Sequence, residues 1–278
     1  MTTTIPADSL RPIRTTTLTV QTAGGGADIT VADRDRTRPF LLLHGGGGVP
    51  TMTGFADLLA ERTHSRVLLP THPGFGGTTR PAGLATTRDL AAAYAALLDG
   101  LDLTDVTVIG NSFGGWVAAE IALLRSPRIS GAVIIDGIGI EVNGHPMTSV
   151  AGLAPAELAK LSFHDPVKAP RPPAAGGTGP SPDIQALVGY AGPTMSDPTL
   201  LGRLRDLDLP VHVIWGESDG IVDPDYGRAY AAALPVSTFT LLPRTGHLPQ
   251  VETPEELLGA ICDLGRESAA THTTGRTP

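Results

Sequence analysis

The chain has 278 residues, of which 41% are hydrophobic and 17% charged, so it is long enough for one large α/β domain with a full core, and wholesale disorder is excluded. Its net charge of −8 argues against binding to nucleic acid, because a phosphate backbone requires a basic face. Its single cysteine, Cys262, excludes an intramolecular disulfide and any metal site built from several cysteines.

No segment of the sequence indicates export or insertion into a membrane. The first ten residues lack the basic start and apolar run of a secretory signal. No stretch approaches the roughly 18 apolar residues that a membrane span needs. We therefore expect a cytoplasmic protein that acts on a small molecule, with no membrane or nucleic-acid partner, no cofactor and no metal. The oligomeric state stays open.

Short apolar runs predict the strands. Residues 15–21 and 27–31 alternate in polarity, as exposed strands do, and are separated by a turn at residues 23–26. Later runs are rich in Val, Ile and Leu and mostly uninterrupted, which is typical of strands buried on both faces of a parallel sheet. They cover residues 39–43, 66–70, 106–110, 129–136, 211–215 and 238–242.

Helical segments alternate with these strands. Residues 87–100 carry leucines on one helix face, with Thr86 and Asp89 as a capping box and Gly100 as a stop. Thr253 and Pro254 predict the start of a last helix over residues 254–265. The alternation predicts an α/β fold with a doubly wound, mostly parallel sheet of about eight strands. We expect its core to comprise residues 1–139 and 208–278, frayed over the first ~14 and last ~12 residues.

Residues 140–207 interrupt this rhythm with helical patches and no convincing strand, which predicts a helical lid inserted between two strands. Within it, the Pro- and Gly-rich residues 169–182 predict a mobile loop that allows opening and closing. Apolar side chains in and next to the lid either line a substrate pocket or pack the lid against the sheet. They are Ile138, Ile140, Met147, Leu161, Phe163, Leu187 and Tyr190.

The run from Gly110 to Gly115 (GNSFGG) follows an apolar strand and precedes a helix predicted over residues 116–124. This is the context of a nucleophile elbow, in which a serine on a strained turn exposes its oxygen at the positive end of a helix. An ordinary Gly-rich turn is the alternative interpretation. We expect Ser112 to be the nucleophile.

A second glycine run, His44 to Gly48, also follows an apolar strand. Glycines leave backbone N–H groups unobstructed, so the amides of Gly46 and Phe113 are predicted to bind a developing oxyanion. A phosphate-binding loop is disfavoured because the run lacks the G-K-[ST] signature and the G-x-G-x-x-G spacing.

The serine requires a base and an orienting acid. His247 lies after the last strand, at the same sheet edge as Ser112, and is the predicted base. Asp219 follows the strand after the lid and is the predicted acid; Asp136 is the runner-up, and Asp223 is predicted to cap a helix. His212 is predicted to pack in a strand, and the remaining histidines to lie in loops or polar stretches: His64, His72, His145, His164 and His272.

The chain order Ser, Asp, His resembles that of the α/β-hydrolase superfamily. The motifs that carry the resemblance are HGG at 44–46, GNSFG at 110–114, WG at 215–216 with Asp219, GH at 246–247, and HPGFG at 72–76, where that family often has Asp in place of His72. The resemblance covers residues 15–265 and implies a serine hydrolase. It also implies substrate contacts from Gly45 and Leu248.

Two branches of the superfamily compete. One comprises carboxylesterases and lactonases, which implies an acyl-enzyme formed with a small or medium apolar ester or lactone. The other hydrolyses carbon–carbon bonds in ring-cleavage-type diketones, which GNSFGG and Gly246-His247 with Gln250 and Glu252 resemble. That group usually has Trp after the histidine, where this chain has Leu248. It also usually has a lid arginine that binds the substrate carboxylate, whereas Arg171 of this chain lies in the Pro/Gly-rich loop. Ester hydrolysis therefore ranks first. A biosynthetic hydrolase or lyase using the same triad is the remaining alternative, while receptor and interaction roles have less support.

Overall fold

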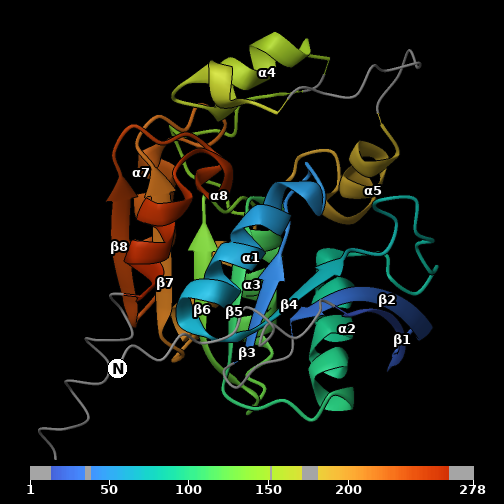
Figure 1. Ribbon diagram of the computed structural model, residues 1–278. Helices are drawn as coiled ribbons and strands as arrows, with labels where there is room; N and C mark the ends of the chain where they lie inside the picture. Colours follow the sequence, from blue (N-terminus) through green and yellow to red (C-terminus); the bar gives the residue numbers. More distant parts are fainter. Residues whose placement is uncertain (1–13, 35–38, 151, 171–180, 263–278) are drawn as a thin grey trace, which may run out of the picture.

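The computed structural model describes residues 14–34, 39–150, 152–170 and 181–262. One twisted sheet of eight strands runs through the molecule, and helices cover both of its faces (Figure 1). The strands are β1 (Arg14–Thr22), β2 (Gly25–Arg34), β3 (Pro39–Leu43), β4 (Arg66–Thr71), β5 (Val106–Asn111), β6 (Ile129–Ile135), β7 (Val211–Gly216) and β8 (Ser237–Leu242). The helices are α1 (Pro50–Thr63), α2 (Thr87–Gly100), α3 (Phe113–Leu123), α4 (Pro155–Ser162), α5 (Pro182–Ala191), α6 (Leu200–Arg203), α7 (Pro224–Ala233) and α8 (Pro249–Glu252), with 3₁₀ turns η2 (Pro166–Lys168) and η3 (Leu204–Asp206).

The strand order is β1-β2-β4-β3-β5-β6-β7-β8. Strands β3 to β8 are parallel to one another, and β2 is antiparallel to both of its neighbours, β1 and β4. This confirms the predicted mostly parallel sheet. The first two strands are longer than predicted, because Gly25 and Gly26 belong to β2 and the turn shrinks to two residues. They are also not exposed throughout: Ile29 is completely buried, since one face of β2 packs on the core.

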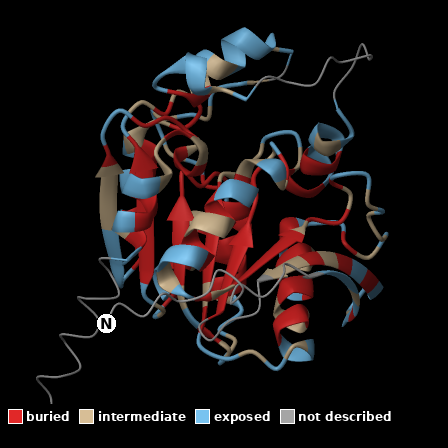
Figure 2. Cartoon of the chain, viewed as in Figure 1, coloured by how far each residue is buried: buried red, intermediate tan, exposed pale blue. Residues whose placement is uncertain are grey.

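Alternate residues of the central strands enter two separate hydrophobic cores, because successive side chains of a strand point to opposite faces. In β3, Leu41 and Leu43 belong to the core that also contains residues of α2, α3 and α7. Phe40 and Leu42 belong to the other core, with residues of α1 and of the helix over residues 254–262. Figure 2 shows this buried centre, flanked by helices with exposed outer faces. Burial on both faces explains why these strands appear as uninterrupted apolar runs.

Local signals set most helix ends. The Thr86–Asp89 capping box opens α2, which ends at Gly100 as predicted. Asp223 caps α7 by accepting a hydrogen bond from the amide of Tyr226. The predicted start of α3 at residue 116 is wrong: the helix begins at Phe113, because a left-handed backbone at Ser112 turns the chain within one residue.

After β8 the chain forms the short helix α8, which the sequence analysis did not predict, and then a helix over residues 254–262. The latter begins where predicted, and its predicted end lies outside the described residues. Leu257, Leu258 and Ile261 of this helix pack with α1 over one face of the sheet.

Between β6 and β7 the chain forms α4, η2, α5, α6 and η3. In Figure 1, α4 lies apart from the sheet, beyond the C-terminal ends of β6 and β7. Most of the loop predicted over residues 169–182, including Arg171, lies outside the described residues. None of the helices that the structure describes is long and apolar enough to cross a membrane.

Candidate active site

Ser112 occupies the turn between β5 and α3 with φ 55° and ψ −118°, a left-handed conformation that is strained for a residue with a side chain. Its backbone is held on both sides. Its amide donates to the carbonyl of Ile135, and its carbonyl accepts from Gly115, Trp116 and Ile138. The residue is half-buried and lies at the N-terminal end of α3.

The glycines around Ser112 are required by close backbone contacts. A Cβ on Gly110 would lie 2.0 Å from the carbonyl oxygen of Gly114, so strand and helix could not approach as they do. A Cβ on Gly45 would lie 2.9 Å from Cβ of Ser112. The loop after β3 therefore lies directly beside the serine.

His247 and Asp219 form a buried pair with a 2.7 Å hydrogen bond between Nδ1 and Oδ2. The other Asp219 oxygen, Oδ1, accepts from the amides of Ile221 and Val222 at 2.8 and 3.1 Å. Because a carboxylate only accepts, Nδ1 carries a proton, and in the neutral form of the ring Nε2 is the acceptor. This is the tautomer that a general base requires.

Asn111 connects the loop of His247 to the serine turn. Its amide nitrogen donates to the carbonyl of His247 at 2.9 Å and to that of Ile135 at 3.2 Å. Its oxygen accepts from Gln250 Nε2 at 3.0 Å. Since Asn111 directly precedes Ser112, these bonds bring His247 to the serine turn.

Glu252 connects this loop to the segment after α4. Its buried carboxylate accepts from the amides of His164, Asp165 and Gly246 at 3.0, 2.7 and 2.7 Å. The amide of His247 also donates to the carbonyl of Ser162 at 2.8 Å. The inserted segment is therefore bonded directly to the amide of His247 and, through the Glu252 carboxylate, to the amide of Gly246.

Asp136, at the end of β6, lies next to the pair. Its Oδ1 accepts from the amide of Gly216 at 2.8 Å, and burial, with the charge of Asp219 in second place, holds its pKa well above the usual range. Asp136, Asp219 and His247 each have a side-chain nitrogen or oxygen atom within 4.8 Å of the others.

Beneath the glycine loop, two buried histidines form a defined network. His44 Nδ1 donates to the carbonyl of Gly45, so its Nε2 accepts from the amide of His72. His72 Nε2 donates to the carbonyl of His44, and its Nδ1 then accepts from the hydroxyl of Tyr94. Burial lowers the pKa of His44 to about 4 and that of His72 well below its usual range, so both rings are neutral.

Helix α5 is docked on the loops after β3 and β4. A Cβ on Gly46 would lie 2.8 Å from the Leu187 side chain, so this leucine covers the glycine loop. The hydroxyl of Tyr190 donates to the carbonyl of Pro73 at 2.9 Å, and Asp183 accepts from the amide of Gly76 at 2.9 Å. The glycine loop is therefore closed over by the inserted segment.

The residues predicted to contact substrate are all at least partly buried. The amide of Ile138 bonds to the carbonyl of Ser112, and Phe163 lies against Gly246. Ile138, Ile140 and Tyr190 belong to the main hydrophobic core, and Met147 packs against it. Leu248 follows His247 and is half-buried.

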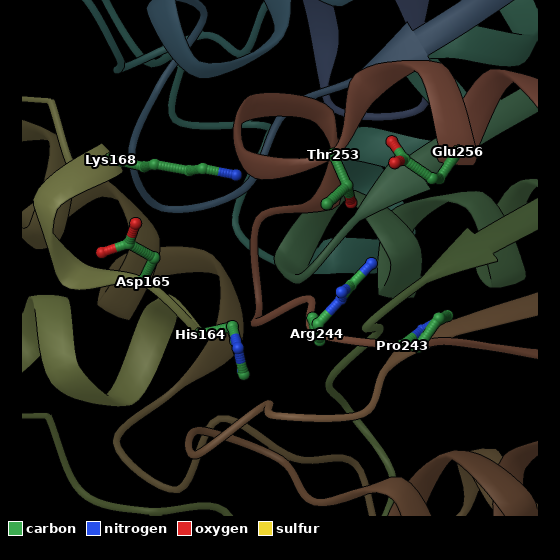
Figure 3. Close-up of a pocket in the computed structure, with 7 residues that line it drawn as sticks. All are labelled: His164, Asp165, Lys168, Pro243, Arg244, Thr253 and Glu256. Atoms are coloured by element: carbon green, nitrogen blue, oxygen red, sulfur yellow. The ribbon is translucent and has the colours of Figure 1, made fainter.

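A polar hollow of about 460 Å³ opens near this region without reaching Ser112 (Figure 3). The segment after α4 and the segment after β8 line it with His164, Asp165, Lys168, Pro243, Arg244, Thr253 and Glu256. Mixed charges and exposure make it a surface groove between the insertion and the core.

Three other histidines each bond to another side chain. His212 is buried in β7 as expected, and its Nε2 bonds to Thr240. His145 lies in a polar loop as predicted, where its Nδ1 pairs with Asp223 at 2.8 Å, and this hydrogen bond raises its pKa. His164 is an exposed residue bonded to Ser218. None of these rings bonds to Ser112 or Asp219 in the described part of the chain.

Residues 40–260 match the sequence model of the alpha/beta hydrolase family. The chain belongs to this family. It is 33% identical over 119 residues to the 2-hydroxy-6-oxo-2,4-heptadienoate hydrolase of Pseudomonas putida, an alignment that covers 42% of this chain and 43% of that enzyme. The chain is therefore matched to less than half of this relative's length.

Two solved structures of the same fold support the assignment. An esterase from Thermogutta terrifontis has a TM-score of 0.68 at 22% identity and covers 91% of this chain and 98% of its own. The meta-cleavage product hydrolase from Pseudomonas fluorescens IP01 has a TM-score of 0.70 at 18% identity, covering 90% and 98%. These two neighbours show that the chain shares its fold with solved members of the family.

Sequence reasoning did not find three features of the site: the bonds of Asn111 and Gln250, the carboxylate clamp of Glu252, and the network of His44, His72 and Tyr94. A signal was present for His72, which stands where the superfamily often has Asp. Gln250 and Glu252 belong to the motif that resembles the carbon–carbon hydrolase group, but their contacts with Asn111 and with the segment after α4 join residues far apart in the chain, and no local pattern marks those contacts.

Proposed function

We propose that this enzyme is a serine hydrolase with Ser112 as nucleophile, His247 as general base and Asp219 as the orienting acid. One observation carries the proposal: a serine at a left-handed strand-to-helix turn has the buried His247–Asp219 pair bonded to its neighbour Asn111. Strain at a functional residue, a defined imidazole tautomer and a rigid connection between the two are the requirements of this chemistry.

The proposed reaction is acyl transfer to water. His247 Nε2 removes the proton as Ser112 Oγ attacks the substrate carbonyl, and Asp219 stabilises the resulting imidazolium. The tetrahedral oxyanion accepts hydrogen bonds from the amides of Phe113 and Gly46. Phe113 is the first residue of α3, where an amide has no acceptor within the helix. Water then hydrolyses the acyl-enzyme with His247 again as base.

We further propose that residues 140–207 act as a lid that selects the substrate. Support comes from Leu187 over Gly46 and from the apolar side chains of Ile138, Phe163 and Tyr190 near the serine and glycine loops. An apolar lining favours a small or medium ester or lactone without charge near the carbonyl. The contacts of Gly45 and Leu248 with substrate belong to the same proposal.

Carbon–carbon bond hydrolysis of a ring-cleavage-type diketone is the second candidate. It is supported by the Pseudomonas putida relative, named as a dienoate hydrolase, and by the bonds that join Asn111, Gln250 and His247. These are residues of the motifs that resemble the carbon–carbon hydrolase group. Both candidates use the same serine, so they differ in substrate and not in nucleophile.

The first experiment is intact-mass labelling with a fluorophosphonate probe on wild type and Ser112→Ala. We expect one adduct on wild type and none on the variant, and a loss of about 10³–10⁶ in kcat for Ser112→Ala on any substrate found. A variant that keeps more than about a tenth of the wild-type rate contradicts the nucleophile assignment. Ester, lactone and dienoate substrates compared by kcat/KM then separate the two candidates.

A further inference from the structure

Asp136 is a buried carboxyl group that the proposed mechanism does not use. It directly follows β6, has a left-handed backbone with φ 45° and is completely buried. Its Oδ1 accepts from the amide of Gly216, but its Oδ2 has no hydrogen-bond partner assigned among the described residues. A buried polar atom without a partner requires an explanation.

The carboxylate of Asp219 lies next to the Asp136 carboxyl group, with an oxygen of each within 4.8 Å of the other. Two carboxylates that share a buried site cannot both be ionised without a large cost, so one of them holds a proton. Asp219 accepts from two amides and from His247, whereas Asp136 accepts from one amide. The negative charge is therefore better stabilised on Asp219, and the proton belongs on Asp136.

We propose that Asp136 is a positioning residue that remains a neutral carboxylic acid and donates its Oδ2 proton to the Asp219 carboxylate. This hydrogen bond satisfies the unpartnered oxygen and holds Asp219 with its Oδ2 toward Nδ1 of His247. The pKa of Asp136, which burial and then the charge of Asp219 raise well above its usual range, agrees with this assignment. The inference rests on the proposed function of the His247–Asp219 pair.

Asparagine is the isostere of a protonated aspartate, so Asp136→Asn is the decisive variant. Its oxygen accepts from Gly216, its NH₂ group donates to Asp219, and asparagine tolerates the left-handed backbone. We expect kcat/KM near wild type and an acid limb of the pH profile that moves by less than about half a unit. Asp219→Asn, the matched control, should lose about 10⁴ in kcat because the imidazole tautomer is no longer held.

The opposite assignment gives a different result. If Asp136 were ionised, Asp136→Asn would remove a negative charge near His247, lower its pKa and move the acid limb downward by about one to three units. Such a shift, or any shift above about half a unit, overturns the proposal.

Infrared spectroscopy of the wild type tests the protonation of Asp136 independently of any activity assay. The spectrum at neutral pH should contain the carbonyl band of a protonated carboxylic acid, and Asp136→Asn should lack it. A wild-type spectrum without the band overturns the proposal, even if the variant does not fold. If the band is present and no hydrolytic activity is found, the proposed function fails while the protonation of Asp136 stands.

Discussion

The Glu252 clamp gives a quantitative test of how the inserted segment is fixed to the proposed site. The carboxylate accepts three backbone hydrogen bonds: Oε2 from His164 and Gly246, and Oε1 from Asp165. Glu252→Gln keeps the size of the side chain but replaces one acceptor oxygen by an NH₂ group. At least one buried backbone amide then faces a donor, and the remaining bonds lose the charge of the acceptor.

The magnitude follows from these three bonds. A hydrogen bond to a charged group contributes about 1.5–3 kcal/mol, and a neutral one about half as much. At the lower end of these ranges, one lost bond and two weakened ones give a decrease of about 3 kcal/mol in the free energy of unfolding. For a chain of this size, that corresponds to a fall of roughly 6–12 °C in Tm.

Urea unfolding of wild type, Glu252→Gln and Glu255→Gln measures this difference. Glu255 is a matched control because its ion pair with Arg62 is exposed, with 57% and 59% of the two side chains accessible, and should contribute less than about 1 kcal/mol. Glu252→Gln should also lower kcat, since Gly246 directly precedes His247. Equal stabilities of the two variants would refute the clamp.

Three further outcomes follow from the structure. Gly110→Ala should abolish activity and soluble expression or strongly lower Tm, because its Cβ would lie 2.0 Å from Gly114 O; a fully active variant contradicts the elbow geometry. Since burial lowers the pKa of His44 to about 4 from 6.5, the unfolded chain binds more protons between these values. The stability that His44 contributes is therefore present above pH 6.5 and is lost as pH falls to about 4, by about 3 kcal/mol, and the urea midpoint of His44→Gln should depend less on pH over that window. Tyr94→Phe leaves Nδ1 of His72 buried without a donor and should cost about 1–3 kcal/mol by the same assay; a loss below about 0.5 kcal/mol argues against the network.

The sheet was predictable because strands that are buried on both faces appear in the sequence as continuous apolar runs. Runs such as residues 39–43 and 211–215 contain almost only apolar residues, and their edges are marked by turn residues. The elbow was predictable for a related reason: Gly110 and Gly114 are needed where strand and helix touch. Helix α8 was not predictable in this way, since its four residues are too few to show a helical period.

The surroundings of the site depend on contacts that sequence patterns do not encode. Asp136 meets Asp219 because β6 and β7 pair in parallel with Ile135 opposite Ile214, a register that no local signal fixes. The acceptor of the His247 amide is the carbonyl of Ser162, and a backbone carbonyl carries no residue identity. Proximity in such cases requires the assembled fold.

The two halves of the inserted segment are attached to the site in different ways, which restricts how the proposed lid could open. The end of α4 is bonded through backbone groups: Leu161 accepts from Gly220 in the loop of Asp219, and Ser162 accepts from His247. Opening there would disturb the proposed base and acid together. Helix α5 instead meets the loops after β3 and β4 through the side chains of Leu187 and Tyr190. Its displacement would uncover Gly46 without breaking any bond of the His247–Asp219 pair, so α5 is the part of the lid whose movement is compatible with an intact proposed triad.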